Sequence, residues 1–177
     1  MRIIRGTLKG KKINAPKSIN ARPTTDFAKE SLFNILENQV DINQLSILDL
    51  FGGTGNISFE FASRGAKNII CIDVQRSSIN FIKKYAEINT LPIRAIKCDA
   101  YKYLKTSENT FDIIFADPPY NHKKSIELPD LVFNSMILNN NGLLIIEHGV
   151  ENDFSFHENF IEKRTYSRVN FSIFKHL

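Results

Sequence analysis

The fold is indicated first by residues 46–55, SILDLFGGTG, in which a short apolar run ends in a turn rich in glycine. Glycines after a strand let the backbone approach a ligand closely, because no Cβ stands in the way. In an open parallel sheet such turns lie at the carboxyl ends of the strands, where ligands bind. The stretch therefore predicts a strand, a ligand-binding turn and the start of a helix.

The chain on either side repeats this unit of a short apolar run followed by an amphipathic stretch. Alternating strands and helices imply a parallel sheet that is covered by helices on both faces. Two final apolar stretches leave no room for a helix between them and predict an antiparallel hairpin. The sequence thus predicts an α/β fold with a mostly parallel, seven-stranded sheet: strands at 46–51, 68–72, 93–97, 111–116, 142–147, 158–166 and 168–175, and helices at about 55–64, 76–89, 100–105 and 124–138.

A separate extension is expected to precede this alternating region. Residues 2–14 have the pattern of a small hairpin, with Gly6 and Gly10 available for turns. Asp26 is a suitable N-cap for a helix that runs to about Asn38. We therefore expect an N-terminal extension over 1–40 and a main domain over 41–177, which together form one compact unit.

The composition is that of a soluble globular protein with 177 residues, 42% of them hydrophobic and 24% charged. Both cysteines, Cys71 and Cys98, lie in apolar runs, where a free thiol behaves as a small hydrophobic group. The basic N-terminus does not resemble a signal peptide, and no segment has the roughly 20 apolar residues of a membrane span. We expect a cytoplasmic monomer with no membrane partner and no disulfide.

The net charge of +4 is unevenly distributed along the chain. The first 22 residues contain seven basic residues and no acidic one, so the remainder has a net charge of −3. A basic segment on a slightly acidic body favours a polyanionic partner, although a solvated terminus has the same composition. The candidate contacts to RNA are Arg2, Arg5, Lys9, Lys11, Lys12 and Arg22, and Lys17 is the seventh base.

Acidic residues after the predicted strands suggest how a nucleotide-like ligand is held. Gly53 and Gly55 match two positions of the dinucleotide-binding fingerprint, but Ser58 occupies the third, which favours a ligand without a diphosphate over NAD. Asp73 follows Gly53 by 20 residues, the spacing at which a carboxylate accepts hydrogen bonds from ribose hydroxyls. Asp99 follows the next strand and could accept from an adenine amino group. Glycine turns and strand-end acids also occur for purely structural reasons.

The most specific motif is Asp117-Pro118-Pro119-Tyr120, directly after the strand at 111–116. The two prolines make the backbone rigid and remove two N–H donors, which leaves carbonyl and carboxylate acceptors. Such acceptors suit an NH₂ group on a base, whose nitrogen must become tetrahedral before it can attack a methyl donor. Tyr120 can stack on a base that has left its helix. The alternative is a rigid turn with a structural role only.

Taken together, these motifs resemble those of class I S-adenosylmethionine-dependent methyltransferases that act on amino groups of bases. The N-terminal residues resemble the ribosomal small-subunit methyltransferase D family more specifically: Arg2-Ile3-Ile4, Gly10, Arg22-Pro23-Thr24-Thr25-Asp26 and Glu30-Ser31-Leu32-Phe33-Asn34-Ile35-Leu36. Departures from the family pattern are Gly52, Tyr120 and Ser167, where the family often has another small residue, phenylalanine and glycine respectively.

The resemblance covers essentially the whole chain and implies a Rossmann-like class I fold with S-adenosylmethionine as cofactor. It implies cofactor contacts at Asp49, Gly53, Gly55, Asp73 and Asp99, and a target-amine site at Asp117, Pro118 and Tyr120. The implied substrate is 16S rRNA or the small ribosomal subunit, with methylation of N2 of guanine 966.

Two other functions remain open on the sequence. An adenine-N6 or cytosine-N4 methyltransferase uses the same Asp-Pro-Pro-Tyr chemistry, although such enzymes usually need a separate recognition region, and only 57 residues follow Tyr120. A catalytically silent RNA-binding module would explain the basic segment but not the coincidence of the motifs. No metal site is expected, because the four histidines have no metal-ligand spacing with the cysteines.

Overall fold

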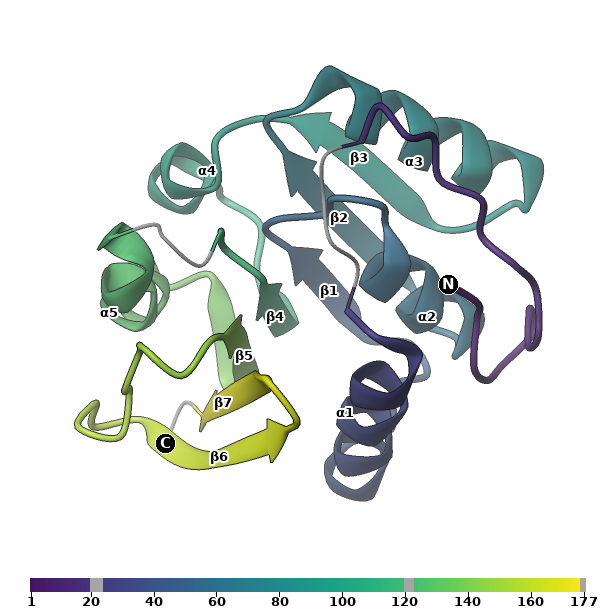
Figure 1. Cartoon of the computed structure of the whole chain (residues 1–177). Coiled ribbons are helices and arrows are strands. Elements are labelled where there is room, and N and C mark those ends of the chain that lie inside the picture. Colours follow the sequence, from purple (N-terminus) through teal and green to yellow (C-terminus); the bar gives the residue numbers. More distant parts are fainter. Residues whose placement is uncertain (20–23, 120–122, 176–177) are drawn as a thin grey trace.

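In the computed structural model, which describes residues 1–19, 24–119 and 123–175, seven strands form one sheet with helices on both faces (Figure 1). The strands are β1 (Ser46–Asp49), β2 (Asn68–Asp73), β3 (Ile93–Lys97), β4 (Phe111–Ala116), β5 (Leu138–His148), β6 (Phe160–Tyr166) and β7 (Val169–Lys175). The helices are α1 (Asp26–Gln39), α2 (Asn56–Ser63), α3 (Arg76–Ile88), α4 (Ala100–Thr106) and α5 (Leu128–Asn134), with a 3₁₀ helix, η1 (Lys123–Glu127), before α5.

The strand order, β3-β2-β1-β4-β5-β7-β6, confirms the mostly parallel sheet expected from the sequence. Strands β1 to β5 pair in parallel with one another, whereas β7 pairs antiparallel with both β5 and β6. The chain runs outward from β1 to β3 and then continues on the other side of β1 with β4. Ligands of such sheets bind outside the strand ends at this reversal.

The apolar runs are continuous because both faces of the strands are buried, as is usual for parallel sheets. On one face, α4 and α5 pack on side chains such as Leu48, Ile70 and Ile114. On the other, α1 and α2 cover the alternate side chains, among them Ile47 and Ile113. The glycine turn and the strand ends are thus held by a core on each side of the sheet.

Two local expectations differ from the structure. The helix expected over 124–138 is divided into η1 and α5, because Pro129 lacks an N–H and clashes with the preceding turn, so it can lie only in the first turn of a new helix. Thr25, not Asp26, is the N-cap of α1, and its hydroxyl accepts from the Ala28 N–H at 3.2 Å. The N-terminal hairpin is present but short: an antiparallel bridge joins Arg2 and Lys12, and backbone hydrogen bonds run from the Ile3 N–H to the Lys11 carbonyl and from the Ile13 N–H to the Met1 carbonyl.

The N-terminal segment is fixed to α2 through its backbone. The buried Glu60 carboxylate accepts from the N–H groups of Ile4 at 2.8 Å and Arg5 at 3.0 Å. The backbone carbonyl of Ser63 accepts from the Thr7 N–H at 2.8 Å. The segment therefore packs as part of the molecule over residues 1–13, while Arg22 lies outside the described residues. Within the described chain, no helix has the length and apolar character that crossing a membrane requires.

Candidate active site

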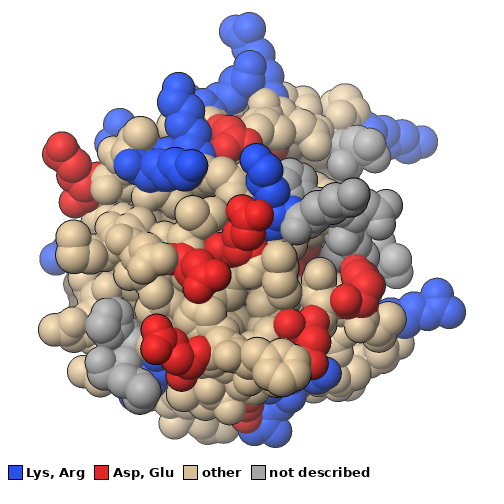
Figure 2. Space-filling model, turned by 90° about the vertical axis from the view of Figure 1, so that its left-hand side faces the viewer, with Lys and Arg blue, Asp and Glu red and all other residues tan. Residues whose placement is uncertain are grey.

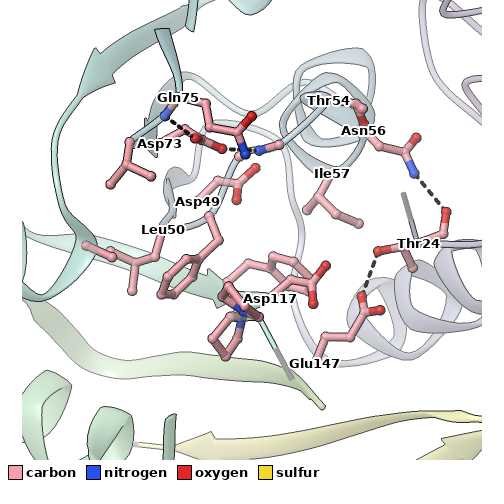
Figure 3. Close-up of a pocket in the computed structure, with 18 of the residues that line it drawn as sticks. Thr24, Asp49, Leu50, Thr54, Asn56, Ile57, Asp73, Gln75, Asp117 and Glu147 are labelled. Atoms are coloured by element: carbon pink, nitrogen blue, oxygen red, sulfur yellow. Dashed lines mark hydrogen bonds between the residues drawn. The ribbon is translucent and has the colours of Figure 1, made fainter. Parts of the chain in front are cut away.

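A cavity of about 540 Å³ opens at the C-terminal ends of the parallel strands, at the reversal of strand order (Figure 3). Its walls come from the turns after β1, β2, β3 and β4, from the end of β5 and from the residues before α1. A volume of this size is in the range of sites for small molecules and cofactors. It is therefore the candidate active site.

The glycine turn after β1 forms the floor of the cavity and has the close packing that glycine permits. Gly55, the N-cap of α2, has a φ of 76°, and a Cβ there would lie 2.7 Å from the Phe59 ring. A Cβ on Gly52 would lie 2.3 Å from Cys71 Sγ. Gly53 also has a positive φ, of 50°. A side chain at Gly52 or Gly55 would therefore force the turn or its neighbours Cys71 and Phe59 to move.

Asp73 stands at the end of β2 and ties the two neighbouring turns together. Its carboxylate accepts from the Gly53 N–H and from the Gln75 N–H, each at 2.7 Å (Figure 3). Both oxygens are thereby oriented at the cavity wall, and a carboxylate oxygen can accept a further hydrogen bond. The position fits the predicted contact with ribose hydroxyls.

Asp99 lies at the next strand end, and its structural role is to cap α4. Its carboxylate accepts from the Lys102 N–H at 2.9 Å, and the residue is exposed at the edge of the cavity. Val74, the residue after Asp73, also lines the cavity and is an apolar residue that is 57% exposed. This combination of an apolar surface and an acceptor suits the face and amino group of an adenine.

Asp49, the last residue of β1, is buried under the glycine turn. Its carboxylate accepts from the Ser58 hydroxyl at 2.6 Å and contacts Cys71 Sγ at 3.8 Å. Burial raises the pKa of Asp49 from 3.8 to about 6, with a smaller contribution from the charge of Asp73. The carboxylate is therefore a poorly solvated negative group near the cavity, which would favour a cationic ligand.

Asp117 follows β4 directly, and Pro118 and Pro119 continue the cavity wall. Burial raises the pKa of the Asp117 carboxyl well above its ordinary value, and the charges of Glu147 and Asp49 raise it further. Asp117 is thus a stronger base than an ordinary carboxylate and is positioned to accept from a donor in the cavity. Tyr120, the fourth residue of the motif, lies outside the described residues.

Three lining residues were not among the residues predicted from the sequence. Glu147 lies at the end of β5, and its carboxylate accepts from the Thr24 hydroxyl at 2.6 Å (Figure 3). Arg168 lies in the turn between β6 and β7. Glu147 follows an apolar run just as Asp49 and Asp117 do, so the strand-end pattern could have identified it. Thr24 lies in the motif at 22–26 that carries the family resemblance, but no role was assigned to it, and nothing in the sequence indicated Arg168.

The charge of the cavity excludes one class of ligand. Five carboxylates line it, from Asp49, Asp73, Asp99, Asp117 and Glu147, and Arg168 is the only basic residue among the described lining residues. A diphosphate would be repelled, whereas a sulfonium or amino group would be attracted. Figure 2 shows acidic side chains grouped in the middle of one face of the molecule, with Lys and Arg side chains above them and also at the right and lower edges.

The described residues of the predicted RNA contact lie outside this cavity. Arg5 pairs with Glu37 at 2.7 Å, and Arg2 lies 3.5 Å from Asp26. The exposed Lys9, Lys11 and Lys12 form no ion pair within the described residues. Of the residues expected to contact the cofactor and the amine, Asp49, Gly53, Asp73, Asp99, Asp117 and Pro118 line one cavity, whereas Gly55 does not line it. The described basic residues of the N-terminal segment lie on a different part of the surface.

Comparisons with known proteins agree with this geometry. A family model described as "Conserved hypothetical protein 95" matches residues 1–175. Ribosomal RNA small subunit methyltransferase D of Buchnera aphidicola subsp. Baizongia pistaciae is 33% identical over 83% of this chain and 75% of its own. The solved structure of the putative methyltransferase yhhF from Escherichia coli has 27% identity and a TM-score of 0.85, covering 99% of this chain and 97% of that one.

A more distant solved structure adds information on the fold. SMU.776, a putative methyltransferase complexed with SAH, has 20% identity and a TM-score of 0.66, covering 83% of this chain and 49% of that one. The shared arrangement confirms the Rossmann-like methyltransferase fold expected from the sequence. With a family match over nearly its whole length and a curated relative at 33% identity, the chain belongs to the family of ribosomal RNA small subunit methyltransferase D.

Proposed function

We propose that the protein transfers a methyl group from S-adenosylmethionine to the exocyclic N2 amine of a guanine in 16S rRNA, with guanine 966 as the target implied by the family resemblance. The observation that supports this best is the position of Asp117, a basic carboxylate beside a rigid proline turn, in a cavity lined by five acidic residues. Membership of a family of rRNA methyltransferases supports the choice of substrate.

The cavity has separate parts for the cofactor and for the target base. The turn at Gly53, the carboxylates of Asp73 and Asp99 and the apolar Val74 fit a ribose and an adenine. Asp117 and Glu147 lie at the ends of β4 and β5, on the other side of β1 from Asp73. A base entering between Asp117 and the glycine turn would place its amine beside the methyl donor.

When bound, S-adenosylmethionine would supply an electrophilic methyl group on its sulfonium sulfur. Breaking of the bond between the sulfur and the methyl group would leave the neutral thioether S-adenosylhomocysteine. Asp117 accepts a hydrogen bond from the target amine, and the Pro118 carbonyl is proposed to accept the second. These acceptors favour the tetrahedral nitrogen, whose lone pair then forms the new N–C bond. Asp117 takes the proton that the nitrogen loses, since its raised pKa makes it a better base than an ordinary carboxylate.

The N-terminal segment is proposed to bind RNA outside the cavity. Its exposed lysines, Lys9, Lys11 and Lys12, offer positive charge to phosphates, whereas the cavity would repel them. This arrangement would draw the RNA backbone to the basic segment and admit only an unpaired base to the acidic cavity. Use of naked rRNA or of an assembled subunit, a monomeric state and a cytoplasmic location remain predictions.

The proposal is tested with purified protein, labelled S-adenosylmethionine and small-subunit rRNA offered both naked and assembled into subunits. Nucleoside analysis should find the label in N2-methylguanosine. Calorimetry should show binding of S-adenosylmethionine and S-adenosylhomocysteine and no binding of NAD. Label in N6-methyladenosine or N4-methylcytidine would instead identify an adenine-N6 or cytosine-N4 methyltransferase. Binding of RNA without any methyl transfer would identify a catalytically silent RNA-binding module.

A further inference from the structure

Arg168 is the only basic residue among the described residues that line the acidic cavity. Because it is exposed and also lines the cavity, it lies at the cavity's mouth. Within the described chain it forms no ion pair, whereas Arg5 and Arg64 both pair with Glu37. A guanidinium keeps its charge at any ordinary pH, so this positive charge is available to an anionic ligand.

The position of Arg168 is fixed by a short and well-attached hairpin. Tyr166 pairs with Val169 across the turn, so Arg168 occupies one of two loop positions. The buried side-chain amide of Asn170 donates to the Gly149 carbonyl, directly after β5, at 3.0 Å. Strand β7 also pairs with β5 over Leu143–His148. The turn is therefore held at the end of β5, and Arg168 is presented to the cavity by a rigid element.

The start of α1 forms the neighbouring part of the mouth. Figure 1 shows the turn between β6 and β7 beside α1, and the Phe27 and Tyr166 rings make an edge-to-face contact with centroids 6.0 Å apart. Phe27 is 67% exposed, and Thr25, two residues before it, lines the cavity. A free cation beside an exposed aromatic ring is the combination that single-stranded nucleic acids bind, through phosphates and base faces.

The order of the strands places Arg168 far from the cofactor end of the cavity. Asp73 and Asp99 follow β2 and β3 on one side of β1, whereas Asp117 follows β4 on the other side. Strand β7 lies on this second side, two strands beyond β4. Arg168 therefore belongs to the end of the cavity where the target amine is proposed to enter.

The target nucleotide brings its own anion to this end, because each base is joined to a backbone of negatively charged phosphates. The five carboxylates of the cavity would repel a phosphate. A base can thus enter the cavity only if its phosphates stay outside, at the mouth. Arg168 is the described lining residue whose charge would attract them there.

We propose that Arg168 binds a backbone phosphate next to the target nucleotide and thereby positions its base in the cavity. This inference rests on the proposed function and names a substrate contact of the same site. The planar guanidinium presents paired N–H donors that match two phosphate oxygens. The contact is distinct from those proposed for Lys9, Lys11 and Lys12, which lie outside the cavity and would bind phosphates away from the target.

The test measures methyl transfer to rRNA, naked or assembled as the wild-type enzyme requires, with one altered phosphate introduced by RNA ligation. Arg168→Gln should lower kcat/KM by about tenfold or more, the effect of losing a charge-assisted hydrogen bond. A neutral methylphosphonate on the 5′ or the 3′ side of the target guanosine should lower wild-type kcat/KM by a similar factor at one of the two positions. On that substrate Arg168→Gln should show no further loss, because enzyme and RNA then lack the same contact.

Two controls accompany the variant. Arg94→Gln removes an exposed arginine of β3, at the opposite side of the sheet from β7, and should keep kcat/KM within about twofold of wild type. Binding of S-adenosylmethionine to Arg168→Gln, measured by calorimetry, should equal that of wild type, which also shows that the variant is folded.

The outcomes separate the possible failures. Wild-type kcat/KM in Arg168→Gln, or losses from the variant and from each neutral linkage that simply multiply, would overturn the inference and leave guanine methylation intact. Weaker cofactor binding by the same factor as the loss of kcat/KM would also overturn it, by assigning Arg168 to the carboxylate of S-adenosylmethionine. Absence of label in N2-methylguanosine with the wild-type enzyme would overturn the proposed function itself.

Discussion

The N-terminal segment and the cavity differ in charge and in the way their polar groups are used. The segment exposes Lys9, Lys11 and Lys12 while its backbone is fixed by Glu60. The cavity instead turns carboxylates inward, and burial raises the pKa of Asp49 and Asp117. The difference indicates that two separate surfaces serve the two tasks. The basic segment would attract a polyanion, and the acidic cavity would bind an amine, because a single surface cannot attract ligands of both charges.

The largest effect is expected from Asp117→Ala, which removes the acceptor at the reacting nitrogen. Because the carboxylate acts mainly as the nitrogen becomes tetrahedral, kcat should fall by roughly 100-fold or more. Binding of S-adenosylmethionine, measured by calorimetry, should stay near the wild-type value. The exposed Asp41→Ala is a control for loss of a surface carboxylate and should be fully active. Normal turnover by Asp117→Ala would rule out the amine-acceptor mechanism.

Asp73→Ala tests the cofactor end of the same cavity. Loss of the carboxylate removes the expected ribose contact and leaves the Gly53 and Gln75 N–H groups without this acceptor. Binding of S-adenosylmethionine should weaken by about 1–3 kcal/mol, the usual cost of stranded polar partners. Titration calorimetry measures this directly. An unchanged dissociation constant would place the ribose elsewhere in the cavity.

Substitutions in the basic segment should change the binding of RNA and leave the binding of the cofactor unchanged. If Lys9, Lys11 and Lys12 each neutralise a phosphate, their joint replacement by Gln should reduce the salt slope of RNA binding by roughly two to three. Cofactor affinity should not change, because none of the three lysines lines the cavity. If the slope of the logarithm of the RNA-binding constant against the logarithm of salt concentration does not change, the three lysines are solvated and do not contact phosphates.

The pH dependence of the rate should show the influence of the neighbouring carboxylates on Asp117. Its pKa is raised by burial first and then by the charges of Glu147 and Asp49. If the ionised form is active, the rate rises with pH through this raised pKa. Glu147→Gln removes one negative charge, lowers the pKa of Asp117 and should move the rise to lower pH. An unchanged pH profile would show that the two groups do not interact, and a shift to higher pH would contradict the proposed effect of the Glu147 charge.

The smallest effect is expected at Ser167, in the turn that joins β6 and β7 next to Arg168. Ser167 has a φ of 60°, a conformation that glycine adopts without the strain caused by a Cβ. Ser167→Gly should therefore increase the free energy of unfolding by about 1 kcal/mol. Denaturant titration of both proteins provides the measurement. A destabilised variant would show that the serine side chain makes a compensating contact.

Much of the fold was predictable because the information is local. The apolar runs before Asp49, Asp73 and Asp117 have strand length and are bounded by turn residues, so the strands and the acidic residues at their ends could be placed together. The single helix predicted over 124–138 is wrong because the apolar spacing continues through Pro129. Spacing alone does not show that the proline begins a new helix.

The rest of the site depends on contacts between distant parts of the chain. Thr24 and Glu147 are 123 residues apart, and no sequence pattern connects them. The charges of the N-terminal segment were visible, but its attachment to Glu60 was not, since that contact spans 55 to 56 residues. Sequence could thus locate four of the five carboxylates of the cavity, whereas the contact between Glu147 and Thr24 and the attachment of the N-terminal segment required the structure.

Guanine methylation by this protein can be tested by mapping modified nucleotides in small-subunit rRNA from cells that lack it. We expect loss of one N2-methylguanine, its restoration by the wild-type gene and no restoration by Asp117→Ala, with the variant protein present at normal levels. An unchanged modification pattern in the cells without the protein, or full restoration by Asp117→Ala, would contradict the proposal.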